Sequence, residues 1–129
     1  MSHYGFTKQV NLSYEKALEV VTVELQKEKF GILTEIDVKA TLKKKLDVDF
    51  PKYKILGACN PPFAHKALQA EQDIGLLLPC NVLVYEKDSK TYISVIKPSV
   101  AMSMVDNPNL AEIAGEVETK LKKVFDSVN

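Results

Sequence analysis

The sequence contains no arginine and no tryptophan, so all 17 of its basic residues are lysines. Arginine holds carboxylates, phosphates and guanine edges through two parallel hydrogen bonds, whereas lysine presents a single point charge. The 17 acidic residues balance the lysines, and the formal net charge is zero. The chain therefore has no overall attraction for polyanions. We expect neither a nucleic-acid partner nor arginine-dependent phosphoryl transfer.

Cysteine and long apolar runs are also scarce. Cys59 and Cys80 are the two cysteines, which is too few for a secreted scaffold held by disulfides. The longest apolar run covers residues 74–79, far short of the roughly 20 residues that a transmembrane helix needs. The first residues show no basic segment followed by an apolar stretch, as a secretory signal would. We therefore expect reduced thiols, a cytoplasmic location and no membrane partner.

What the chain does contain suits a globular protein. Its 129 residues are a common length for one domain, and 46% of them are hydrophobic, which is enough for a core. No internal repeat, low-complexity tract or linker divides the sequence. We expect a single domain over residues 1–129.

Hydrophobic residues at helical spacing predict two long helices, over residues 14–29 and from Pro108 to about residue 128. Shorter helices are expected after Asp37 and after Asn60, each of which suits an N-cap position. Gly31 is expected to supply the turn out of the first helix. Runs rich in β-branched and aromatic residues predict five strands, at residues 4–10, 30–36, 53–58, 80–86 and 91–97.

These elements predict an α+β two-layer sandwich, in which two long helices cover one face of a sheet of about five strands. The last two strands are joined by residues 87–90 and are expected to form a hairpin. The pairing of the third and fourth strands is left open, because the intervening helix permits either a parallel crossover or an antiparallel neighbour.

One group of residues has the chemistry of a site. Cys59 immediately precedes the Asn60 cap, where a helix N-terminus favours a thiolate, and His65 lies about one turn into that helix. Cys80 begins the next strand. If the two strands are antiparallel neighbours, both thiols lie at one end of the sheet; if the connection is parallel, they lie at opposite ends.

Other interpretations compete with this thiol site. The spacing C-x5-H-x14-C matches no common zinc signature and supplies three ligands where a structural site needs four. Free cysteine is also among the residues most often buried as a small hydrophobe. The metal at such a site is therefore unknown, and inert buried thiols are the ordinary alternative.

Two further groups are weaker candidates for a polar site. Glu35 and Asp37 lie two residues apart at a strand end, but Asp37 is already explained as a helix cap. A lysine-rich helix face could bind phosphate, although such a face is usually just solvated; it comprises Lys39, Lys43, Lys44 and Lys45.

Three segments, GILTEIDV at 31–38, YKILGACNP at 53–61 and IGLLLPCNV at 74–82, carry a resemblance. Over nearly its whole length the chain resembles the domain-of-unknown-function 302 family, in which E-I-D, N-P and L-P-C-N-V recur in this order. The resemblance implies a β-α-β(4)-α layout, an antiparallel sheet, a small bacterial or archaeal cytoplasmic protein and a homodimer. It implies no activity. The positions that match the family pattern are Glu35, Asp37, Asn60, Pro61, Pro79 and Cys80.

We therefore expect a small cytoplasmic binding or interaction domain without a catalytic motif, whose partners are a second copy and a small ligand or metal. The alternative is a thiol-based redox or soft-metal-binding protein that uses Cys59, His65 and Cys80. The sequence assigns no cofactor.

Overall fold

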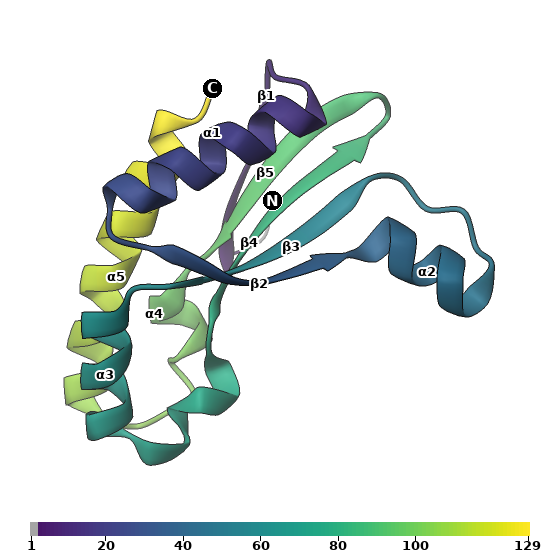
Figure 1. The fold of residues 1–129 in the computed structure, drawn as a ribbon. Coiled ribbons are helices and arrows are strands. Elements are labelled where there is room, and N and C mark those ends of the chain that lie inside the picture. Colours follow the sequence, from purple (N-terminus) through teal and green to yellow (C-terminus); the bar gives the residue numbers. More distant parts are fainter. Residues whose placement is uncertain (1–2) are drawn as a thin grey trace.

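The structure is a computed structural model that describes residues 3–129 (Figure 1). Met1 and Ser2, the first residues of the expected domain, lie outside the described residues. Within residues 3–129, no helix is long and apolar enough to cross a membrane. The elements in chain order are β1 (Gly5–Val10), α1 (Tyr14–Lys27), β2 (Gly31–Asp37), α2 (Val38–Leu46), β3 (Tyr53–Cys59), α3 (Pro61–Ala70), the 3-10 helix η1 (Gln72–Leu77), β4 (Cys80–Lys87), β5 (Lys90–Ile96), α4 (Pro98–Ala101) and α5 (Pro108–Ser127).

The five strands form one sheet in the order β1-β5-β4-β3-β2, and every neighbouring pair is antiparallel. This confirms the predicted α+β fold and the layout that the family resemblance implies. The predicted hairpin is β4–β5, whose two-residue turn has Asp88 and Ser89 at positive φ (52° and 63°). Positive φ at both central residues defines a type I′ turn, which matches the twist of the flanking strands.

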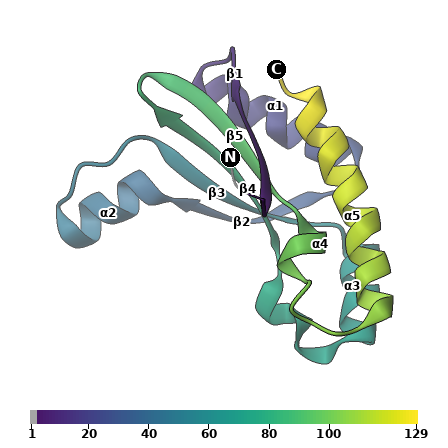
Figure 2. The same ribbon diagram turned by 180° about the vertical axis from the view of Figure 1, so that it is seen from behind.

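The two long helices, α1 and α5, lie against one face of the sheet (Figures 1 and 2). Alternate residues of a strand point to opposite faces, so one set from each central strand enters this core. Val82 and Val84 of β4 lie between the helices and the sheet, with Ile93 and Val95 of β5 beside them, and all four are at most 1% exposed. Burial against this face therefore fixes the register of the sheet.

A second, smaller core lies beyond one end of the sheet. It is formed by α3, η1, the segment after α4 and the first half of α5, and its buried members are Ala67, Ile74, Met102, Leu110 and Ala114. The chain enters this region at the end of β3 and leaves it at the start of β4 (Figure 1). The ends of β3 and β4 therefore lie between the two cores.

The end of α1 differs from the prediction. Lys29, with φ 70°, takes the left-handed conformation, whereas no glycine has positive φ in the described residues. The Phe30 amide donates to the Leu25 carbonyl and the Lys29 amide to the Gln26 carbonyl, both at 3.0 Å. These two bonds form a Schellman motif, in which buried Phe30 also packs near buried Leu25. The prediction of a Gly31 turn was wrong, because this apolar contact places the bend two residues earlier.

The hairpin-like extension of β2 and α2 projects from the body of the molecule (Figure 2). Asp37 caps α2 as predicted, since its Oδ1 accepts a hydrogen bond from the Ala40 amide at 2.9 Å. No residue of α2 is buried. We call residues 36–50 the α2 arm; its exposed apolar side chains are Ile36, Leu46, Val48 and Phe50.

Candidate functional site

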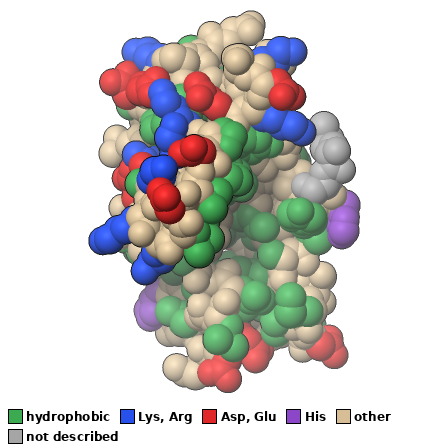
Figure 3. Space-filling model, turned by 90° about the vertical axis from the view of Figure 1, so that its right-hand side faces the viewer, with side chains coloured by type: hydrophobic (Ala, Val, Ile, Leu, Met, Phe, Trp, Pro, Cys, Tyr) green, Lys and Arg blue, Asp and Glu red, His purple; other side chains and the backbone are tan. Residues whose placement is uncertain are grey.

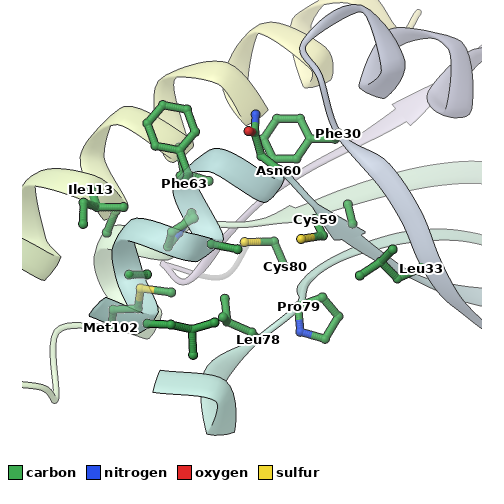
Figure 4. Close-up of a pocket in the computed structure, with 17 residues that line it drawn as sticks. Phe30, Leu33, Cys59, Asn60, Phe63, Leu78, Pro79, Cys80, Met102 and Ile113 are labelled. Carbon is green, nitrogen blue, oxygen red and sulfur yellow. The ribbon is translucent and has the colours of Figure 1, made fainter. Parts of the chain in front are cut away.

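A cavity of about 290 Å³ lies where the two cores meet, at the ends of β3 and β4 (Figure 4). Its walls come from both cores and from segments far apart in the sequence. The lining residues are Phe30, Leu33, Ala58, Cys59, Asn60, Phe63, Ala64, Ala67, Leu68, Leu78, Pro79, Cys80, Pro98, Met102, Ile113, Ala114 and Val117.

The antiparallel pairing of β3 and β4 brings the two thiols to this cavity. Ala58 is the register partner of Cys80, so Cys59, the next residue of β3, lies beside the start of β4. Cys59 is half-buried and Cys80 is buried; neither is in a disulfide. Of the two arrangements considered from the sequence, the structure has the antiparallel one, and both sulfur atoms are drawn in the same close-up (Figure 4).

The surroundings of these thiols differ from those of a reactive cysteine. Burial raises the pKa of the Cys80 thiol to about 11, with a smaller contribution from the neighbouring Cys59, so Cys80 stays protonated at neutral pH. The helix that begins after Cys59 opens with Pro61 and Pro62. Proline has no amide hydrogen, so two of the free donors that make a helix N-terminus attractive to anions are missing here.

His65 lies apart from the thiols. It is exposed on α3 and is absent from the residues that line the cavity. Within residues 3–129, no three His, Cys, Asp or Glu side chains are grouped so that they could hold a metal ion. The structure therefore brings together two members of the predicted Cys59, His65 and Cys80 group and leaves the third in solvent.

Asn60 is the N-cap of α3, as predicted, but its side chain bonds elsewhere. It occupies the N-cap position of α3, where its carbonyl accepts from the Ala64 amide at 2.9 Å. Its side chain makes no capping bond; instead Nδ2 donates to the Glu28 carbonyl at 3.1 Å and so ties the start of α3 to the end of α1. The predicted N-cap position is therefore confirmed, and the side chain bonds to a carbonyl that the end of α1 leaves without a helical partner.

The second polar candidate lies away from the cavity and is satisfied by local partners. Glu35 forms an ion pair with Lys54 of the neighbouring strand, at 2.7 Å between Oε1 and Nζ, and Asp37 is the cap of α2. The lysine-rich face of α2 is exposed, and Lys43 pairs with Asp47 at 2.9 Å. The geometry gives neither group a convergent site.

Most of the residues that line the cavity could not be predicted from the sequence. The apolar side of α3, which includes Phe63 and Ala64, is visible as a helical pattern, but Phe30, Met102 and Val117 reach the same space from three other parts of the chain. Nothing in the local sequence links them. None of the 17 lining residues is charged or a histidine, so the cavity has the chemistry of an apolar binding site.

A family model with the description "Domain of unknown function DUF302" matches residues 6–128. The chain belongs to the DUF302 family. It is similar to a crystal structure of an uncharacterized conserved DUF302 protein from Bacillus stearothermophilus, with a TM-score of 0.93 and 30% identity, covering 99% of this chain and 100% of that one. No curated protein matches the chain. The resemblance seen in the sequence motifs is thus confirmed.

The motif residues of this DUF302 protein cluster unevenly in the structure. Asn60, Pro79 and Cys80 line the cavity and Pro61 begins the helix that forms one of its walls, whereas Glu35 and Asp37 belong to β2. All three matched segments nevertheless reach the cavity, because Leu33 of the segment at 31–38 also lines it.

Within residues 3–129, no helix covers the face of the sheet opposite α1 and α5 (Figures 1 and 2). Tyr53, Tyr85 and Tyr92 stack across β3, β4 and β5, with ring centroids 5.2 Å and 5.4 Å apart. Phe50 of the α2 arm meets Tyr53 edge-on. Seen from this side, the surface of the DUF302 chain is hollowed beside the α2 arm and hydrophobic side chains line the hollow (Figure 3).

Proposed function

We propose that this DUF302 protein is a non-catalytic binding module and that the cavity between its two cores holds a small apolar molecule. The observation that carries the proposal is the cavity's lining, which contains apolar side chains, two thiols, one thioether and one amide. Proton transfer needs a group that titrates near the working pH. Cys80, with its pKa raised to about 11, is no such group.

The volume supports a ligand of modest size. Ligand cavities commonly measure about 300–1,000 Å³, and an apolar cavity of about 150 Å³ in another protein binds benzene. At about 290 Å³, this cavity has room for a bicyclic ring system. Charged molecules are disfavoured, because no opposite charge lines the walls to offset the loss of hydration.

The proposal is tested by a substitution that places a larger side chain in the cavity. Ala64 is a half-buried lining residue of α3, so Ala64→Leu adds apolar atoms to the space that the ligand would occupy. Gln69→Leu is the matched control, since it adds a leucine to an exposed position of the same helix outside the cavity. Binding of 2-naphthol, a neutral bicyclic probe, is measured by its fluorescence change and by calorimetry.

We expect the natural protein and Gln69→Leu to bind 2-naphthol equally and Ala64→Leu to lose most of this binding. Absence of binding to the natural protein, or equal binding by Ala64→Leu, would count against the cavity as a binding site. Release of a chemically altered naphthol would count against the non-catalytic part of the proposal.

We also propose that two copies of the chain associate through the open face of the sheet. Interface cores are depleted of charged residues and enriched in tyrosine, and the central rows of this face have that composition. Tyr53, Tyr85 and Tyr92 form one row, and Ile55 and Leu83 are paired in the next.

The α2 arm supports the same assembly. A nine-residue helix is marginally stable by itself in water, and α2 buries none of its residues within the chain. Ile36 and Val48 of the arm are 48% and 45% exposed. A specific interface of standard size buries about 800 Å² on each partner, and the open face together with the arm spans three strands and a helix. Each chain thus offers a second copy two contact surfaces, the hollow on the open face and the projecting apolar α2 arm.

The association is tested by placing a charge at the centre of the face. We expect Tyr85→Lys to convert a dimer into a monomer, as measured by size-exclusion chromatography with light scattering. Val23→Lys is the control, because Val23 is 49% exposed on α1 at the other side of the molecule. A natural protein that is monomeric at its highest soluble concentration would overturn this proposal.

A second candidate function is thiol chemistry between Cys59 and Cys80, either as a reversible disulfide or with both sulfurs on a soft metal ion. It is favoured by one observation, that both side chains line the same cavity. Hydrogen peroxide treatment followed by non-reducing peptide mapping tests the redox version. Two separately alkylated peptides and no cross-linked pair would contradict it.

The two free thiols also support a reducing, cytoplasmic location.

A further inference from the structure

The cavity contains one side chain with nitrogen or oxygen atoms. Asn60 is 6% exposed and is the sole such residue among those that line the space. Its Nδ2 group is engaged with the Glu28 carbonyl at 3.1 Å. An amide carries both a donor end and an acceptor end. The acceptor, Oδ1, therefore needs a hydrogen-bond donor of its own.

Oδ1 is left free for another donor. Asn60 makes no side-chain capping bond at the start of α3, and the single hydrogen bond of its side chain within residues 3–129 is the one from Nδ2. In the same part of the chain, no fully buried side-chain oxygen or nitrogen lacks a partner. Oδ1 is therefore not fully buried, and Asn60 is one of the residues that line the cavity.

The walls near this amide have a second chemical feature. Phe30 and Phe63 both line the cavity, and the close-up draws the Asn60 amide between their rings (Figure 4). The sulfur atoms of Cys59, Cys80 and Met102 belong to the same lining. Aromatic rings prefer aromatic partners in edge or offset contact, and sulfur makes favourable contacts with ring edges. This lining therefore favours an aromatic ligand over a saturated one.

Building on the proposed function, we infer that the ligand is a neutral aromatic molecule of bicyclic size that carries one hydroxyl or N–H donor. Its ring system fills the space between the two cores, and its donor bonds to Oδ1 of Asn60. Asn60 thus acts as the specificity-determining residue, since a ligand that lacks the donor leaves a buried acceptor unpaired.

Three probes with one carbon skeleton test this inference on the natural protein. 2-Naphthol has the ring and the donor, 2-methoxynaphthalene has the ring without the donor, and decahydro-2-naphthol has the donor on a saturated skeleton. We expect 2-naphthol to bind more tightly than 2-methoxynaphthalene by about 3- to 10-fold, the contribution of one net hydrogen bond. We expect it also to bind more tightly than the saturated alcohol by a few-fold.

A substitution of Asn60 tests whether this residue causes the tighter binding of 2-naphthol. Asn60→Leu keeps an apolar side chain of similar size and removes the acceptor, so we expect 2-naphthol and 2-methoxynaphthalene to bind it equally. The comparison of the three probes on the natural protein decides the inference even if Asn60→Leu does not fold, because the variant also loses the bond to Glu28.

The outcomes separate this inference from the proposed function. If none of the three probes binds, the cavity is no ligand site and the proposed function fails. If 2-methoxynaphthalene or decahydro-2-naphthol binds as tightly as 2-naphthol, and Ala64→Leu still abolishes binding, the cavity is a binding site and the inference about its ligand is overturned.

Discussion

The two faces of the sheet are built from alternate residues of the same strands, yet one face is buried under helices and the other is partly exposed. On the covered face, Val84 and Ile93 are at most 1% exposed beneath α1 and α5. On the open face, the adjacent residues Tyr85 and Tyr92 stack on one another and stay partly exposed. The alternation shows that half of each central strand is buried within the single chain, while the other half leaves apolar side chains partly exposed.

The largest expected effect is a difference in the free energy of unfolding between substitutions on the two faces of the sheet. Leu121 of α5 is fully buried against the covered face, so Leu121→Ala should lower the free energy of unfolding by about 2–5 kcal/mol. Leu83 is half-buried on the open face, and Leu83→Ala should cost less than half as much. Urea unfolding at low protein concentration measures both; equal losses would show that the open face contributes to the core of the single chain.

The thiols extend the comparison to the end of the sheet. Cys80 pairs in register with buried Ala58 and is itself buried, and its raised pKa of about 11 compares with 9.0 for an unperturbed thiol. Its thiolate fraction at pH 8 should therefore be lower by about 100-fold. We expect iodoacetamide to modify Cys59 first, with Cys80 reacting at least 10-fold more slowly, as followed by peptide mass mapping. Comparable rates would mean that the cavity opens readily to solvent.

A tight contact on the open face is expected to have the next largest effect. A Cβ atom added at Gly57 would lie 2.7 Å from Cγ of Pro79 and would also collide with the Thr34 side chain. Gly57→Ala should therefore lower stability by about 1–3 kcal/mol. Gly31→Ala is the control, because nothing lies within 4 Å of the corresponding Cβ. A melting temperature unchanged by Gly57→Ala would show that this end of the open face can shift without cost.

The smallest effect has the opposite sign. Gly115 lies on the exposed side of α5, and a Cβ atom there would meet nothing within 4 Å. Since glycine is less favourable than alanine inside a helix, Gly115→Ala should raise stability by about 0.5–1 kcal/mol. Thermal unfolding measures the gain. A loss would indicate that the outer side of α5 packs against something besides solvent.

Local patterns in the sequence were sufficient to predict most of the architecture. The apolar stripe of α5 and its Asn107-Pro108 start are confirmed, as is the hairpin that closes at Asp88 and Ser89. These features depend on residues within a few positions of one another, so their physics can be read from a short window. The family motifs added the antiparallel order of the sheet, which periodicity alone had left open at β3 and β4.

The candidate site was predictable only in part, because it depends on which segments meet in space. The two thiols share the cavity, but His65 is exposed and does not line it, and Asn60 bonds to a carbonyl 32 residues earlier in the chain. The turn after α1 uses Lys29 because two buried apolar residues pack around it. Each of these outcomes is decided by tertiary contacts that no local pattern contains.

The order of the strands also constrains how the chain matures during synthesis. β1 is made first, but its partner in the sheet is β5, with Gly5 opposite Ile96 and Val10 opposite Thr91. The Asn11 amide also bonds to the carbonyl of Asn129, which follows α5. Pairing across such long stretches of chain is slow. During synthesis β1 therefore stays without its sheet partner until β5 has also been made.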